Sequence, residues 1–185
     1  GNLDPSGTTT IATTGTGTIT ITGTGGQTSD TANKGVDIGS ESTGDRNSIL
    51  IETASGDIDI TGTGGVWDAL EANNSTQVPG LRLSSLTLRT TAGGDISATG
   101  TGPTSTTSVF GDRDGIVIEN DVLVSTFVAT SPPTDPYGAI TLVGDAHGTG
   151  EGVDMDDTTD IEVVAASGGL TITGQVLGES GDGSA

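Results

Sequence analysis

A heptapeptide pattern, Gly-x-Ile/Leu-x-apolar-x-Gly, recurs five times along this chain of 185 residues. Its copies span residues 17–23, 56–62, 94–100, 138–144 and 168–174. Apolar residues alternate mainly with Thr, Asp or Ser in each copy, which predicts a short strand with one buried face. The glycines at both ends allow the backbone to bend there. Since one strand type recurs along the whole chain, the sequence predicts a solenoid.

Two further strand types lie between the copies and always follow in the same order. The second type opens on a glycine and is expected at residues 35–38, 80–83, 115–118 and 152–155. The third type is expected at residues 49–51, 86–88, 122–124 and 161–163, with Ile11 as its earliest member. The strand order is constant while the loops vary in length, as stacked coils allow, because insertions point outward from the core.

These strand types predict an all-β fold, a right-handed parallel β-helix (β-solenoid) with three strands per coil and about five coils. The handedness follows from the right-handed preference of parallel crossover connections. Residues 1–185 are expected to form a single continuous segment, one repeat of a longer fibre. Two inward columns are expected on the first strands, Ile19/Ile58/Ile96/Ile140/Leu170 and Ile21/Ile60/Ala98/Leu142/Ile172.

The composition fits a narrow aliphatic core. Aromatic residues make up 2% of the chain and hydrophobic residues 30%, which is too little for a conventional sandwich or helix-bundle core. Low hydrophobicity with a net charge of -20 is typical of disordered chains, but a disordered chain has no reason to keep registered strands. A core of stacked Ile, Leu and Val on Thr-rich strands fits both the low hydrophobic content and the regular spacing of the strands.

The charge balance and the missing cysteines exclude several classes of protein. The chain has 25 acidic and only five basic residues, so contact with nucleic-acid phosphates would be repulsive. No apolar run reaches the length of a membrane span, so direct membrane insertion is not expected. Cysteine is absent, which excludes disulfides and thiolate metal sites. Acidity, Thr and Ser richness and the lack of Cys together favour an extracellular or cell-surface protein.

The blocks Gly-Asp-Ile-x-Ile/Ala-Thr-Gly-Thr-Gly at residues 56–64 and 94–102 carry a family resemblance. They resemble the repeats of large bacterial surface β-helix proteins, of the filamentous-haemagglutinin and autotransporter-adhesin type. The resemblance covers essentially the whole chain. It implies an exported, extended protein with an adhesive or structural role.

Acidic clusters are the candidate metal ligands. Asp112 and Asp114 share a tight turn, and Asp154 and Asp156 belong to an acidic corner further along the chain. Carboxylate oxygens are the ligands that Ca²⁺ prefers, so Ca²⁺ is the one cofactor considered. A solvated acidic turn that aids solubility explains the same residues and stays open as the alternative.

Few residues suit catalysis or modification. His147 is the only histidine, and no nucleophile elbow or phosphate-binding loop accompanies it. A polysaccharide-active β-helix enzyme would need aromatic platforms, whereas Trp67 and Tyr137 lie in different insertions, so no enzymatic activity is expected. Asn73 and Asn74 each begin an Asn-x-Ser/Thr glycosylation sequon.

The outward positions of the first strands offer a different function. Two columns are expected there, Thr20/Asp59/Ser97/Thr141/Thr171 and Thr22/Thr61/Thr99/Val143/Thr173. A flat Thr array on a β-solenoid resembles an ice-binding face, although Asp57 and Asp59 interrupt it. An ice-binding or Ca²⁺-dependent surface-binding module is therefore the alternative function.

The function predicted from the sequence is that of a structural repeat in an extracellular β-solenoid filament or giant surface adhesin. Its expected partner is itself, stacked head to tail, together with cell-surface or matrix components. Residues 1–12 supply second- and third-strand candidates, and residues 168–174 supply a first strand. Joined end to end, these pieces continue the strand order from one copy into the next.

Overall fold

The described part of the chain consists of β-strands joined by turns and contains no helix. The computed structural model describes residues 9–26, 33–39, 49–66, 78–104, 112–126, 138–155, 161–165 and 168–177. The strands are β1 (Thr9–Ala12), β2 (Ile19–Thr24), β3 (Val36–Ile38), β4 (Ile49–Thr53), β5 (Ile58–Thr63), β6 (Leu81–Thr90), β7 (Ile96–Thr101), β8 (Asp112–Arg113), β9 (Ile116–Ser125), β10 (Ile140–Gly148), β11 (Val153–Met155), β12 (Ile161–Val164) and β13 (Leu170–Leu177).

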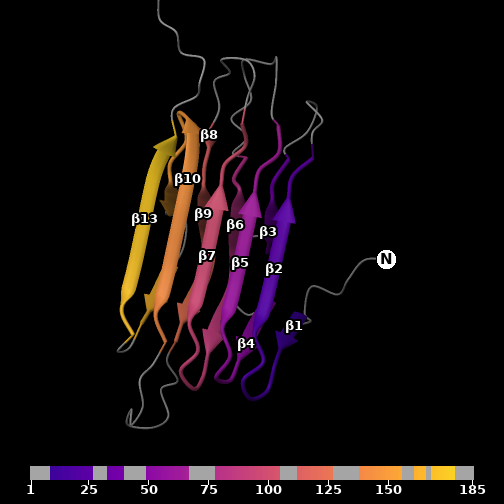
Figure 1. Ribbon diagram of the computed structural model, residues 1–185, viewed down its shortest axis with the longest axis vertical. Helices are drawn as coiled ribbons and strands as arrows, with labels where there is room; N and C mark the ends of the chain where they lie inside the picture. The colour runs from indigo at the N-terminus through magenta and orange to yellow at the C-terminus, as the bar shows by residue number, and fades with distance from the viewer. Residues whose placement is uncertain are drawn as a thin grey trace, which may run out of the picture.

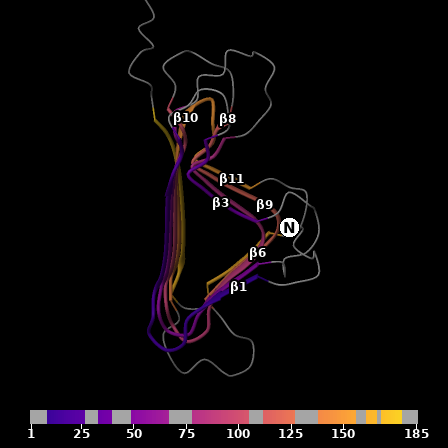
Figure 2. The same ribbon diagram turned by 90° about the vertical axis from the view of Figure 1, so that its right-hand side faces the viewer.

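These strands form two sheets that face each other. The first, here called the flat sheet, has the order β13-β10-β7-β5-β2, with β8 antiparallel to β10 (Figure 1). The second, the bent sheet, has the order β1-β4-β6-β9-β11, with β3 on β6 and β12 on β9. In Figure 2 the flat sheet forms one straight side of a roughly triangular outline, and the bent sheet forms the other two sides.

The heptapeptide copies pair with one another residue for residue. Ile58 lies opposite Ile19 on one side and Ile96 on the other, and all strand pairs in this series are parallel. Ile140 continues the column, and Leu170 ends it. The predicted register of the first strands is therefore confirmed. The same holds for the second and third strand types, which pair in the bent sheet in the order read from the sequence.

The prediction of separate second and third strands is wrong at two places. They are joined into the continuous strands β6 and β9, which turn a corner in mid-strand. Ser85 and Asn120 make these corners with positive φ angles of 52° and 58°, so one left-handed residue replaces a loop. The Nδ2 of the buried Asn120 donates a hydrogen bond of 2.7 Å to Ser84 Oγ, which ties one corner to the next.

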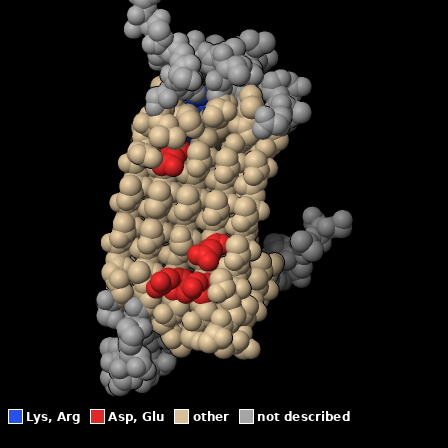
Figure 3. All heavy atoms as spheres, in the orientation of Figure 1, with Lys and Arg blue, Asp and Glu red and all other residues tan. Residues whose placement is uncertain are grey.

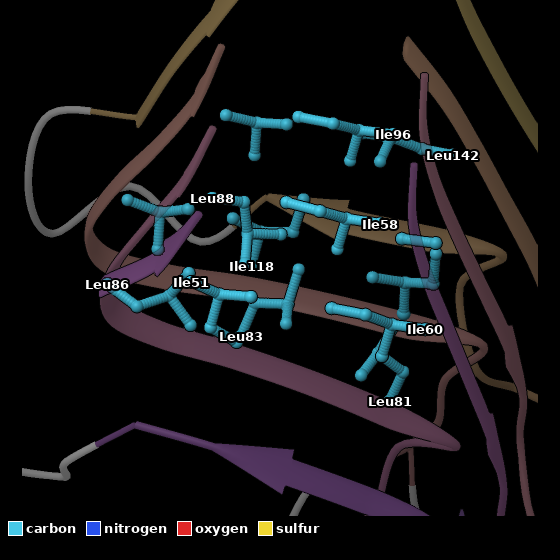
Figure 4. Packing of buried hydrophobic residues seen from close by; sticks show 14 of the residues in the cluster. Ile51, Ile58, Ile60, Leu81, Leu83, Leu86, Leu88, Ile96, Ile118 and Leu142 are labelled. Carbon is cyan, nitrogen blue, oxygen red and sulfur yellow. The ribbon is translucent and has the colours of Figure 1, made fainter. Parts of the chain in front are cut away.

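The core is a narrow ladder of aliphatic side chains. Ile58, Ile96 and Ile140 are at most 1% exposed. In Figure 4, Ile58 and Ile96 lie across the core from side chains of the bent sheet such as Leu88. The largest fully buried side chains are Ile51, Ile58, Ile60, Leu81, Leu83, Leu86, Leu88, Ile96, Ile116, Ile118, Ile140 and Leu142. Each such side chain contributes about 1.5–3 kcal/mol when it leaves water. Five of the twelve belong to the predicted inward columns and the other seven lie on the bent sheet, so both sheets supply the driving force.

The glycine that ends each heptapeptide has a different role from the one predicted. Gly62 and Gly100 have no left-handed backbone; instead they face inward against the glycine that opens the next second strand. A Cβ on Gly100 would lie 2.1 Å from the carbonyl oxygen of Gly115, and one on Gly62 would lie 2.2 Å from that of Gly80. Close packing of two backbones, rather than bending, therefore requires glycine here.

Threonine side chains hold the opposite corner, where the third strand leads into the next first strand. The Oγ1 of Thr90 donates a hydrogen bond of 2.7 Å to the carbonyl oxygen of Gly94, and Thr53 makes the equivalent bond to Gly56. Both hydroxyl groups are buried. They satisfy carbonyl groups that the turn would otherwise leave without a donor.

Truncating a central core residue tests this account of stability. Ile58→Ala or Ile96→Ala should lower the free energy of unfolding by about 2–5 kcal/mol, because each change leaves a cavity between stacked strands. The outward Thr61→Ala change should stay within about 0.5 kcal/mol of the parent. Urea denaturation of the three variants measures both effects, and equal losses at Ile58 and Thr61 would contradict the observed register.

Candidate functional site

The outer face of the flat sheet carries a regular array of side chains, most of them neither acidic nor basic (Figure 3). Neighbouring strands lie about 4.8 Å apart, and alternate residues of one strand lie about 6.6 Å apart. The strand register sets the two expected columns, Thr20/Asp59/Ser97/Thr141/Thr171 and Thr22/Thr61/Thr99/Val143/Thr173. Both columns predicted from the sequence are therefore confirmed as rows of neighbours across the sheet. The second column contains no charged residue.

Carboxylates interrupt the array near the start of the strands. The Oδ1 of Asp57 accepts a hydrogen bond of 2.9 Å from the backbone N–H of Asp95. The Oδ1 of Asp95 in turn accepts one of 2.7 Å from the N–H of Ala139. Each carboxylate is thus bound by the next strand, and this offsets part of the repulsion expected between stacked acidic residues. Figure 3 shows acidic side chains gathered near one end of the outer face of the flat sheet.

The structure describes the backbone of three of the four proposed calcium ligands, Asp112, Asp114 and Asp154. Asp112 pairs through its backbone with Gly148, as part of β8. Asp114 is 1% exposed, and its Oδ1 accepts a hydrogen bond of 2.7 Å from the Glu151 N–H. Asp154 lies on β11, opposite Val117.

No group of three or more metal-ligating side chains exists among the described residues. Asp156 lies outside those residues, so calcium binding stays a prediction. Asn73 and Asn74, the two sequon residues, also lie outside them, as do the aromatic residues Trp67 and Tyr137. His147 is on β10, where its backbone pairs with that of Arg113.

A ladder of charged side chains, not predicted from the sequence, crosses the bent sheet. Arg82 on β6 is 8% exposed, and its Nη1 lies 3.0 Å from the Oδ1 of Asp37 on β3. Its Nε donates a hydrogen bond of 2.5 Å to the Oε1 of Glu119 on β9. Lys34 Nζ lies 2.8 Å from the other Asp37 oxygen. The sequence could have indicated this ion pair, because Asp37 and Arg82 occupy the same position in successive second strands.

The ion pairs change the pKa values of both partners. Burial alone would raise the pKa of the Asp37 carboxyl, but hydrogen bonds from Lys34 and Arg82 outweigh it and hold this pKa below its ordinary value of 3.8. Burial would lower the pKa of the Arg82 guanidinium, whereas Asp37 and Glu119 raise it above its ordinary value. Arg82 therefore remains charged and links three strands of the stack.

The two ends of the stack expose the side chains that lie buried in its middle. Leu170 and Ile172 on β13 are 45% and 46% exposed, although they continue the columns of Ile140 and Leu142, which are 0% exposed. Ile11 on β1, at the other end, is 44% exposed. The exposed large hydrophobic residues of the described chain are Ile11, Met155, Leu170, Ile172 and Val176, all on strands at the ends of the stack.

Comparison with protein-family models, with curated proteins and with solved structures found no match for this chain. Among the described residues no helix is long and apolar enough to cross a membrane. From the geometry described above, two surfaces are the candidate sites: the outer face of the flat sheet and the open ends of the stack.

The Asp37 ion pairs predict an acid-sensitive contribution to stability. Because the folded-state pKa of Asp37 is lowered, this contribution is complete above the ordinary value of 3.8 and is lost as the pH falls through the lower folded-state pKa. Asp37→Asn should lower the free energy of unfolding at pH 7 by about 0.5–1 kcal/mol, since the carboxylate is partly exposed and screened by solvent.

Urea denaturation at pH 7 and at pH 3 measures this contribution. The difference in stability between the two pH values should be smaller in Asp37→Asn than in the parent. Asp59→Asn is the matched control, because it removes the same charge from the outer face of the flat sheet. An equal change in both variants would show that net charge, rather than the ion pairs of Asp37, sets the pH dependence.

Proposed function

We propose that this chain is a structural unit of an extracellular filament or giant surface adhesin. In this role it forms one length of a right-handed, three-sided parallel β-helix of about five coils, and its rigidity is its function. The observation that carries the proposal is the exposure of Leu170 and Ile172 next to their fully buried counterparts. A further coil that kept the register of β13 on β10 would bury these side chains.

Several features of the chain support this role. Apart from β8, each described strand lies parallel to an equivalent strand of a neighbouring coil, so a force along the stack is shared among many hydrogen-bonded strands. The right-handed sense follows the preference of parallel crossovers. The acidic, Thr-rich and cysteine-free composition favours an extracellular or cell-surface setting, with cell-surface or matrix components as further partners. No step of this role needs a catalytic group.

A tandem fusion of two copies in one chain tests the structural role. The junction should bury the end columns of both copies, so the fused chain should unfold in one transition at a higher temperature than the single copy. Five coils at about 4.8 Å per coil should add about 24 Å of length per copy, which small-angle X-ray scattering measures.

The control for the fusion places a charge at the junction. Ile172→Lys in the first copy should abolish the gain in melting temperature, since it puts a charge into the joined core, whereas the outward Thr173→Lys should keep the gain. Two copies that melt at the temperature of one and behave as separate bodies would contradict the proposed function.

Ice binding is the second candidate, favoured by the shape of the flat sheet. Sheets of many strands normally twist, whereas the strands of this one overlie each other in Figure 2. The uncharged column that contains Thr22, Thr61 and Thr99 lies along it. A flat array of hydroxyl and methyl groups at two fixed spacings suits an ordered water lattice.

Thermal hysteresis separates this candidate from the structural role. Ice binding predicts a gap between the melting and freezing points that Thr61→Tyr reduces severalfold and Thr10→Tyr, on the bent sheet, leaves intact. A freezing point that follows solute concentration alone would remove ice binding from consideration.

A further inference from the structure

The two outer strands of the flat sheet lack the features that normally protect sheet edges. Soluble proteins blunt exposed edges with charged residues, proline or bulges. Here β2 (Ile19–Thr24) and β13 (Leu170–Leu177) contain no charged residue and no proline, in a chain with 25 acidic and five basic residues. Both edge strands are therefore open to pairing with another strand.

The two edge strands also match each other in sequence. Ile-Thr-Ile-Thr-Gly in β2 corresponds to Leu-Thr-Ile-Thr-Gly in β13. Within the chain, β2 pairs in parallel with β5, and β10 pairs in parallel with β13, through the same positions. A strand like β13 can therefore lie against the free edge of β2 as β10 lies against β13, with Leu170 opposite Ile19 and Ile172 opposite Ile21.

The bent sheet gives the same alignment independently. In its third-strand column, Val163 of β12 and Ile11 of β1 occupy equivalent positions at opposite ends of the stack. Ile11 is 44% exposed and Val163 is partly buried, so each lacks the neighbour that the other would supply. β1 and β2 carry no charged residue that would oppose such a contact. Two strand pairs on different sides of the stack thus require one and the same arrangement.

We propose that a second copy of this chain docks on the first, its N-terminal end against the C-terminal end, with β13 of one copy parallel to β2 of the next. This inference rests on the proposed structural function and names its partner and register. Thr173 then lies opposite Thr22 of the next copy. The two surfaces are different, so the contact is heterologous, and repetition gives an open polymer rather than a closed dimer.

Disulfide trapping tests the register directly, because the chain has no cysteine of its own. In the double variant Thr22→Cys and Thr173→Cys, the two cysteines of one chain lie at opposite edges of the flat sheet, four strand spacings or about 19 Å apart. A disulfide needs Cα atoms about 4.4–6.8 Å apart, so only a bond between copies can form. Mild oxidation should give a ladder of covalent dimers, trimers and longer species on a non-reducing gel.

Two matched controls define the expected result. The pair Thr61→Cys and Thr173→Cys places one cysteine on β5, away from the edge. The pair Thr20→Cys and Thr173→Cys shifts the register by two residues. Each control should form covalent multimers at least tenfold more slowly than the matched pair. Equal rates in all three variants, or no multimers in any of them, would overturn the proposed docking.

The result also separates this inference from the proposed function. If separate chains form no trapped multimers while the tandem fusion still melts at a higher temperature, docking between copies is wrong and the structural role stands. If the fusion gains no stability, the structural role itself fails, whatever the trapping shows.

Discussion

The structure depends on the contact between each aliphatic side chain and its counterpart on the neighbouring strand. Ile58 is buried because Ile19 and Ile96 lie beside it in register and the bent sheet closes the core from the other side. The chain has few aromatic residues to fill a wider space, so the two sheets must stay close. The inward glycines Gly62 and Gly100 permit that closeness, since any side chain there would collide with a carbonyl group.

On the outer surface the same repetition places acidic side chains next to hydrogen-bond donors of the neighbouring strand. Asp57 and Asp95 bind backbone N–H groups of the next strand, and Gln175 Nε2 donates a hydrogen bond of 2.7 Å to Asp145. On the bent sheet Arg89 pairs with Glu52, one strand away. A shift of one strand along its neighbour would break the polar contacts between those two strands, so the polar ladders support the register that the aliphatic core favours.

Repetition also explains what the sequence could and could not predict. The columns of Ile58 and Ile96 followed from the heptapeptide. Equivalent residues of successive coils can stack on one another in only one register, and that register puts the apolar positions on the buried face. The corners at Ser85 and Asn120 did not follow, since neither residue type marks a left-handed turn as strongly as glycine does. The burial of Asp114 and its hydrogen bond from the Glu151 backbone did not follow either, because the other coils have no Asp at that position; its predicted role as a metal ligand stays a prediction.

Native-state hydrogen exchange tests most directly whether neighbouring coils supply the stability. Amides of β5, β6, β7 and β9 have a strand on both sides, whereas those of β2 and β13 have one. Measured on dilute single chains, protection should be highest in the central strands and fall toward both ends by about tenfold or more. Uniform protection from β2 to β13, or slower exchange at the ends than in the centre, would contradict the account.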